Sequence, residues 1–137
     1  MAEDKYLDIE VVTPQKKIFQ GKAESVNVPG SLSPFEILYN HAPIVSSLDT
    51  GIIRIVNENS DKLFYTVSSG FLENRNNQVS ILVENAVASS EVDKSELSSK
   101  LGKIKEQIGS EEDAAKKEVL KKKALFIEFQ LRSTEMS

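Results

Sequence analysis

The side chains best suited to chemistry lie in one short stretch, residues 29–51, around the only histidine of the chain. His41 stands beside Asn40, and Glu36 and Asp49 are near it in sequence, so the histidine could act as a general base. Catalysis would also need a nucleophile or a metal, and the chain has no cysteine, no second histidine and no serine in a nucleophile elbow. The residues therefore favour a structural or interface role for His41 over a small hydrolase.

The glycines indicate turns and no nucleotide site. Neither a phosphate-binding loop that ends in Gly-Lys-Ser/Thr nor a dinucleotide fingerprint is present. Gly30, Gly51 and Gly70 are predicted to be turn glycines, and Pro29-Gly30 is predicted to stop a strand, with a positive φ at Gly30. No cofactor is expected from these residues.

Two turn clusters, at residues 29–30 and 49–51, frame the region of His41 and predict a fixed loop between them. Phe35, Ile37 and Leu38 within it are predicted to be buried. Residues 40–43 read as a polar loop whose conformation Pro43 restricts, because a proline moves the residue before it toward extended geometry.

Composition bounds the class of protein. The chain has 137 residues, a net charge of -4 and no cysteine, which is the size of one domain that needs neither metal nor disulfide to fold. No apolar run approaches the roughly 20 residues of a membrane span, so we expect any membrane association to come through a partner. No long basic patch with interleaved aromatics supports binding to nucleic acid.

The first part of the chain reads as short strands. From Tyr6, Leu7, Ile9 and Val11 alternate with polar positions, the period of a half-buried strand. Further strands are predicted at residues 17–21, 23–28, 52–56, 62–67, 71–74 and 79–83. Strands at this regular spacing predict an all-β antiparallel sandwich or barrel over residues 1–87.

From Ala86 the composition becomes helical, and residues 88–137 are predicted to form an antiparallel helical hairpin. Ser90 or Asp93 can cap the first helix. Gly109 is predicted to stop it, and Ser110 with Asp113 resembles a capping box that opens the second helix. The apolar stripe of the first helix comprises Leu97, Leu101, Ile104 and Ile108.

The second helix is apolar on two faces. One stripe, which matches the first helix, comprises Leu120, Ala124, Ile127 and Leu131, and the nearly opposite one comprises Ala115, Val119, Phe126 and Phe129. The second stripe either packs on the sandwich or binds a separate partner. The basic side chains Lys116, Lys117, Lys121, Lys122, Lys123 and Arg132 surround it.

An ordered set of short motifs resembles the epsilon subunit of the rotary ATP synthase. They are Val11-Val12-Thr13-Pro14, Phe19-x-Gly21, Pro29-Gly30, Phe35, Ile37-Leu38, Asn40-His41-Ala42-Pro43, Leu48, Gly51, Ser69-Gly70-Phe71-Leu72-Glu73 and Val79-x-Ile81-Leu82. The resemblance covers about the first two thirds of the chain. Ser33 and Pro34 depart from it, because family members usually have a second glycine and an acidic residue there.

The resemblance implies a non-catalytic central-stalk subunit that couples the catalytic head of a proton-translocating ATP synthase to its membrane rotor. The implied partners are the gamma shaft, the c subunits of the rotor ring and, through the helices, the catalytic alpha and beta subunits, at the cytoplasmic face of a bacterial inner membrane. The interface residues expected by resemblance are Ser31, Leu32, Ser33, Glu36 and His41. The inhibitory contacts expected in the second helix are Lys121, Lys122, Lys123, Phe126, Phe129 and Arg132.

Some epsilon subunits bind ATP through a motif of Asp, two variable residues and Arg-Ala at the start of the first helix. This chain has Asp93 followed by Glu96 where the arginine belongs, and a carboxylate would repel a phosphate. We therefore interpret Asp93 as a helix cap. The alternative function is a freestanding β-sandwich binding module whose basic helix captures an acidic protein partner.

Overall fold

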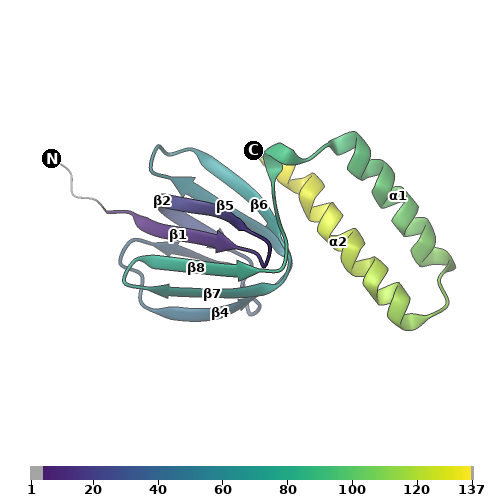
Figure 1. Cartoon of the computed structure of the whole chain (residues 1–137), viewed down its shortest axis with the longest axis horizontal. Coiled ribbons are helices and arrows are strands. Elements are labelled where there is room, and N and C mark those ends of the chain that lie inside the picture. The colour runs from purple at the N-terminus through teal and green to yellow at the C-terminus, as the bar shows by residue number, and fades with distance from the viewer. Residues whose placement is uncertain (1–4, 137) are drawn as a thin grey trace.

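The computed structural model describes residues 5–136, which form a β-sandwich followed by a helical hairpin (Figure 1). The strands within this range are β1 (Leu7–Val12), β2 (Lys17–Val28), β3 (Phe35–Leu38), β4 (Ile44–Leu48), β5 (Gly51–Asn57), β6 (Lys62–Val67), β7 (Gly70–Arg75), β8 (Gln78–Val83) and β9 (Ala86–Ala88). A 3₁₀ turn, η1 (Ser89–Glu91), leads to α1 (Lys94–Ser110) and α2 (Ala114–Met136). The predicted fold class is confirmed.

The strands form one hydrogen-bonded ladder that folds back on itself to make two layers. Their order is β4-β7-β8-β1-β2-β5-β6-β9, and β3 pairs with β2. Neighbours are antiparallel except β1 and β8, which run parallel. β2 is the fold line, because its first half pairs with β1 and its second half with β3 and β5.

The core lies between the layers and follows from the period-2 alternation. Leu7, Ile9 and Val11 of β1 are buried, as the sequence predicts, and Ile53 and Ile55 of β5 face them from the other layer. A strand buries alternate residues on one face. The opposite face of each layer is therefore free to contact water, the hairpin or a partner.

The long strand β2 corrects the prediction of two separate strands at residues 17–21 and 23–28. Gly21 and Lys22 do not interrupt it. The register shifts between Ala23 and Ser25, where the strand passes from one layer to the other. A bulge bends a strand without ending it, so a break in the pattern here marks a corner.

The stretch of residues 29–51 is less of a loop than predicted, since it contains β3 and β4. Ile37 is buried and Phe35 is half-buried, but Leu38 is 51% exposed, which corrects its predicted burial. Leu38 follows Ile37 on a strand, so its side chain points to the outer face.

Gly30 has no positive φ, and neither does any other glycine in residues 5–136, so the predicted reason for this glycine is wrong. A Cβ on Gly30 would lie 2.5 Å from the carbonyl oxygen of Ser33 and 2.7 Å from the ring of Phe35. The residue is glycine because the loop passes too close for a side chain.

The hairpin joins at the end of the sandwich, and α2 returns to it (Figure 1). Asp93 caps α1 through a hydrogen bond that its Oδ1 accepts from the N–H of Glu96 at 3.1 Å. Gly109 does not stop α1, which ends at Ser110, because nothing there requires a left-handed backbone. Ser110 stays in α1, and Asp113 alone caps α2, its Oδ1 accepting from Ala115 and Lys116.

The two helices pack through one apolar seam. Ile104 of α1 and Ala124 and Ile127 of α2 are buried in it, and Leu97, Leu101, Ile108, Leu120 and Leu131 complete it. α2 also packs against β5 and β6. The buried residues of α2 outside the seam are polar, Gln130 and Ser133. Of the second apolar stripe, Ala115 and Val119 are exposed and Phe126 and Phe129 are half-buried.

Candidate interaction surfaces

The groups that could have formed a catalytic site are held apart. His41 precedes β4 and Asp49 follows it, so about 16 Å of strand separates them. His41 Nδ1 lies 2.7 Å from the carbonyl oxygen of Ala42, Asp49 accepts a hydrogen bond from Ser31, and Glu36 forms an ion pair with Arg54 at 3.5 Å. No group of three or more metal-ligand side chains occurs within residues 5–136.

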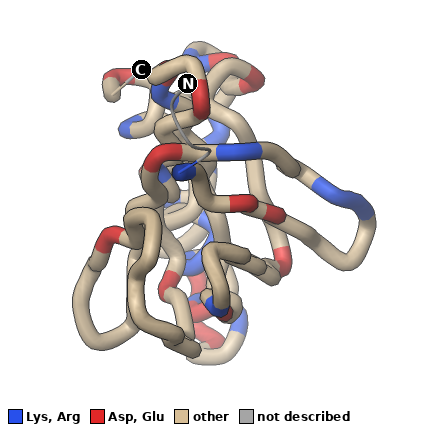
Figure 2. Tube along the Cα trace, turned by 90° about the vertical axis from the view of Figure 1, so that its left-hand side faces the viewer, with Lys and Arg blue, Asp and Glu red and all other residues tan. Residues whose placement is uncertain are grey.

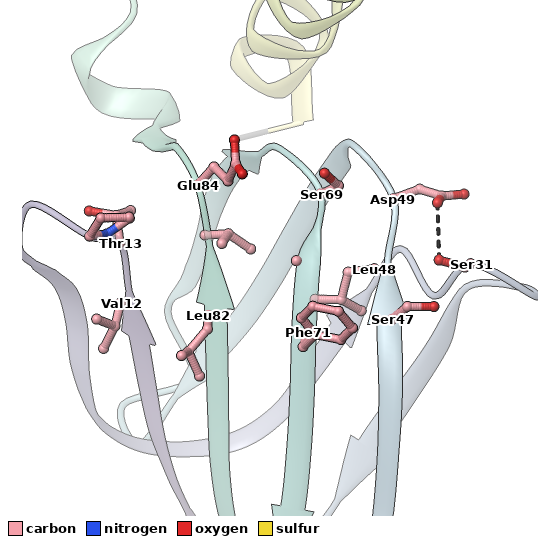
Figure 3. Close-up of a pocket in the computed structure, with 13 residues that line it drawn as sticks. Val12, Thr13, Ser31, Ser47, Leu48, Asp49, Ser69, Phe71, Leu82 and Glu84 are labelled. Carbon is pink, nitrogen blue, oxygen red and sulfur yellow. Dashed lines mark hydrogen bonds between the residues drawn. The ribbon is translucent and has the colours of Figure 1, made fainter.

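The loop that joins β2 and β3 is firmly braced. Ser31 N–H donates to the carbonyl oxygen of Ser47 at 3.0 Å, and Asp49 N–H donates to that of Pro29 at 2.9 Å. The Ser31 hydroxyl donates to Asp49 Oδ1 at 3.0 Å (Figure 3). Leu32 at the tip is 103% exposed. The loop is thus preformed, and it presents an apolar side chain to the surroundings.

The loop of His41 is fixed at the other end of β4. Asn74 Nδ2 donates to the carbonyl oxygens of His41 and Ala42, each at 3.3 Å. Asn40 N–H donates to Asn77 Oδ1 at 2.6 Å. Side chains of β7 and of the turn that follows it therefore set the path of this loop.

The residues expected at the rotor-ring and gamma interface do not form one patch. Ser31, Leu32 and Ser33 are exposed at one end of β4, and His41 lies at its other end. Glu36 is on the outer face of β3, where it pairs with Arg54. If all these residues meet partners, they meet them at separate places on the sandwich.

An apolar row that the sequence pattern does not predict lies on the outer face of the layer that contains β4, β7, β8 and β1. Val12 pairs with Leu82, Leu82 with Phe71 and Phe71 with Ser47, so these side chains cross four strands side by side. Phe71 is 64% exposed and Leu82 56%. We call Val12, Leu82 and Phe71 the outer row; Val45, 72% exposed, lies one step along β4.

A cavity of about 610 Å³ opens beside the outer row, at the end of the sandwich nearer the hairpin. Its lining combines the outer row with Pro14, Leu48 and the polar residues Ser31, Asp49 and Glu84. Figure 3 shows the outer row along the strands and the carboxylates of Asp49 and Glu84 beyond the strand ends. An apolar floor with an acidic edge is suited to a protein partner and offers no catalytic group.

Comparison with known proteins agrees with this geometry. Residues 6–89 match the family described as "ATP synthase, Delta/Epsilon chain, beta-sandwich domain". The chain belongs to this family. An ATP synthase epsilon chain of Magnetococcus marinus is 34% identical over 130 residues, which cover 94% of each chain. That of Pelotomaculum thermopropionicum is 40% identical over 91 residues, 66% of each chain.

Solved structures share the whole fold of this epsilon-type chain. A chain in the Euglena gracilis mitochondrial ATP synthase superposes with a TM-score of 0.78 at 19% identity, covering 100% of this chain and 85% of that one. A chain in the Tetrahymena thermophila central stalk and c-ring gives 0.58 at 13% identity, covering 98% and 99%. As an ATP synthase epsilon chain, the protein is a non-catalytic subunit of an enzyme complex.

The residues of the hairpin that are expected to be inhibitory differ in their exposure. Lys121, Lys122 and Lys123 are exposed, whereas Phe126 and Phe129 are half-buried. Arg132 stacks over the ring of Phe129, 5.0 Å from its centroid. Between the hairpin and the end of the sandwich lies an open groove of about 1430 Å³, lined by both.

Charges on the sandwich are mixed. Viewed from the side remote from the hairpin, acidic and basic residues are scattered along a mostly uncharged chain (Figure 2). Within residues 5–136 no helix is both long and apolar enough to cross a membrane. Two surface features are candidates for binding a partner. They are the outer row and the basic segment of α2, which contains the exposed lysines 121–123.

Proposed function

We propose that this epsilon chain joins the catalytic head to the membrane rotor, with its sandwich against the gamma shaft and the c-ring and its hairpin acting on ATP hydrolysis. Family membership and the central-stalk fold support the first part. The bacterial relatives support a place at the cytoplasmic face of a bacterial inner membrane.

The exposed outer row is the observation that carries the docking proposal. Phe71 and Leu82 lie side by side on paired strands, so the backbone that carries them does not have to be ordered when a partner covers them. Aromatic side chains carried on a rigid backbone are typical anchors of protein interfaces, and apolar neighbours such as Leu82 help to exclude water around them. We assign this face to gamma, because a shaft that turns with its partner needs a permanent apolar contact.

Copurification with gamma tests the assignment. The double change Phe71→Ser and Leu82→Ser should weaken binding to gamma by about tenfold or more, since anchors of this kind contribute over 1 kcal/mol each. Leu38→Ser is the matched control, because Leu38 is also exposed, at 51%, but lies on the other layer. If the double variant and the control bind gamma equally well, the outer row is not the surface that binds gamma.

The basic segment of α2 supports the inhibitory role. Six basic and two acidic side chains lie between residues 114 and 132, and the exposed lysines 121–123 present charge that an acidic surface would attract over a Debye length of about 8 to 10 Å. The partner expected is therefore an acidic segment of the catalytic subunits.

Reconstitution with the catalytic head and gamma tests this role. Deletion of residues 109–137 should raise the ATPase rate, and changing Lys121, Lys122 and Lys123 to glutamate should raise it in part. Added salt should narrow the difference between the lysine and glutamate forms, because it screens exposed charges. ATPase rates that are equal for the full and truncated chains would end the inhibitory assignment.

A further inference from the structure

The outer row lies between carboxylates on both of its sides. On one side, Glu73 is two residues from Phe71 along β7, a distance of about 7 Å on the same face of the strand. On the other side, Glu84 follows the end of β8 and Asp49 follows the end of β4, and both line the cavity beside the outer row (Figure 3). We call Glu73, Glu84 and Asp49 the acidic frame.

The charge of the acidic frame is not neutralised within the described part of this chain. All three side chains are exposed, and none of them takes part in an ion pair within residues 5–136. The Asp49 side chain accepts a hydrogen bond from the neutral hydroxyl of Ser31. Among the described residues that line the cavity, none is basic. The apolar surface is therefore bordered by negative charge that is free to meet a cation.

Basic side chains of this layer do not cancel the acidic frame. Arg75 is the one basic residue of strands β1, β4, β7 and β8, and it lies two residues beyond Glu73, away from the outer row. Lys17 of β2 lies at the end of the row, but its Nζ is 3.7 Å from Glu10 Oε1, so these two charges offset each other. The excess of negative charge is thus concentrated around the outer row.

The hairpin of this chain does not supply the missing cations. Asp49 and Glu84 also border the groove beneath the hairpin, whose lining includes Lys122 and Lys123. No ion pair joins them within residues 5–136, and Glu73 does not line that groove. The cations that complement the acidic frame must therefore come from another molecule.

We propose that the outer row receives a protein segment whose apolar centre is flanked on both sides by lysine or arginine, and that the acidic frame steers this segment into place. Glu73 and Glu84 lie two residues to either side of the paired Phe71 and Leu82, so the partner's cations stand roughly 13 Å apart along the strands. An anionic membrane surface is not the occupant, because the acidic frame would repel it. Naming gamma as this partner rests on the function proposed above, but the charge pattern required of the partner does not.

Association kinetics of the full-length chain with a complex of the catalytic head and gamma test the steering. The double change Glu73→Gln and Glu84→Gln should lower the association rate constant roughly three- to tenfold at low salt and leave the dissociation rate nearly unchanged, because charges at the rim act mainly on the encounter. At about 1 M salt, where the Debye length is about 3 Å, the difference should vanish. Glu58→Gln with Asp61→Asn is the matched control, since it removes two exposed charges from the turn between β5 and β6.

The change of Phe71 and Leu82 to serine separates steering from docking, because the loss of apolar anchors should act mainly on the dissociation rate. If the glutamine variant and its control associate equally fast at low salt while the serine variant dissociates faster, the docking surface stands and the steering proposal is overturned. If the serine variant also binds as the wild type does, the assignment of gamma to the outer row fails as well. Sedimentation of the free chain tests the remaining occupant: dimers that dissociate in salt would replace the partner segment by the basic α2 of a second copy and overturn the proposal.

Discussion

Asn40 and Asn77 clasp each other across two turns that are 37 residues apart in the chain. The N–H of Asn40 donates to Asn77 Oδ1 at 2.6 Å, and Asn77 Nδ2 donates to Asn40 Oδ1 at 3.2 Å. Both residues have positive φ, 66° and 64°, a conformation that asparagine tolerates better than most residues. The clasp ties the His41 loop to the turn between β7 and β8.

We expect Asn77→Gly to lower the free energy of unfolding by about 1 to 2 kcal/mol, because glycine keeps the positive φ but loses both hydrogen bonds. Asn77→Ala should cost about 1 kcal/mol more, since alanine is strained at this φ. Asn76→Gly is the control: Asn76 has a φ of 54° and takes no part in the clasp. Urea denaturation measures all three, and equal stability of the two glycine variants would show that the clasp contributes nothing.

Gly70 should be among the least replaceable residues of the sandwich. A Cβ there would lie 2.0 Å from the carbonyl oxygen of Leu82 and 2.8 Å from the Cα of Val83, and backbone atoms cannot move aside cheaply. We expect Gly70→Ala to destabilise the fold by about 3 kcal/mol or more. Gly21→Ala meets only the Phe19 ring, at 3.3 Å, and should cost much less. Thermal unfolding of both variants gives the comparison, which a mild effect at Gly70 would contradict.

The positions of glycines in turns can be predicted from sequence, but the close contacts that require a glycine cannot. Turn signals place Gly30 between strands correctly, whereas Gly51 and Gly70, also predicted to be turn glycines, are the first residues of β5 and β7. The actual constraint on Gly30 and Gly70 is the approach of another segment, Ser33 and Phe35 in one case and Leu82 in the other. How closely two segments approach each other depends on which strands pair. One pattern of alternating apolar and polar residues is compatible with many different strand pairings. For the same reason the parallel pairing of β1 with β8 could not be predicted.

The outer row escaped prediction for a different reason. Alternation assigns Leu72 and Phe71 to opposite faces, but it does not say whether the outer face of a sheet is covered. Leu82 next to buried Ile81 reads in sequence like a strand buried on both sides. The helices are more easily predicted than the outer row, because apolar residues recur at helical spacing in both of them. The predicted seam between Leu97 and Ile104 of α1 and Leu120 and Ile127 of α2 is confirmed. The end of α1 was misplaced by one residue, since an exposed glycine does not by itself end a helix.

Tyr65 should make the stability of the sandwich fall at high pH. Burial raises the pKa of Tyr65 above its ordinary value of 10.0, and the Glu91 carboxylate raises it further. The folded state thus favours the neutral phenol. Its contribution to the free energy of unfolding is complete below pH 10.0 and is lost as the pH rises through the folded pKa.

Denaturation by urea at several pH values between about 9 and 11 checks this. Tyr65→Phe should remove part of the decline, and Glu91→Gln a smaller part, because burial is the larger cause. Tyr39→Phe, at an exposed position, is the control. A Tyr65→Phe variant whose stability declines with pH as steeply as the wild type would contradict the assignment.

The sandwich is predicted to fold without the hairpin. Its core cluster contains no residue of α1 or α2, and the last strand, β9, ends at Ala88. A chain that ends at Ala88 should therefore keep its strand signal in circular dichroism and a cooperative thermal transition. We expect some loss of stability, since α2 no longer covers β5 and β6. Absence of a cooperative transition would make the hairpin part of the folding unit.

The positions of Leu32 and His41 at opposite ends of β4 predict that the two loops serve different partners. Leu32 is fully exposed on its braced loop, so Leu32→Asp should leave the free energy of unfolding within about 0.5 kcal/mol and yet weaken an apolar contact with the c-ring. His41→Ala should likewise leave the fold intact, because the hydrogen bond of its ring is a local one, to the neighbouring Ala42 carbonyl.

Proton pumping per ATP in membranes, measured together with copurification with gamma, separates the two loops. If Leu32 faces the ring and His41 the shaft, Leu32→Asp lowers pumping while gamma still copurifies, and His41→Ala weakens the association with gamma. Glu36 is a poor probe of either contact, because its carboxylate lies 3.5 Å from Arg54 and its loss also removes an internal ion pair. Unchanged pumping and binding in a folded double variant at Leu32 and His41 would take both loops out of the interfaces and leave docking to the outer row alone.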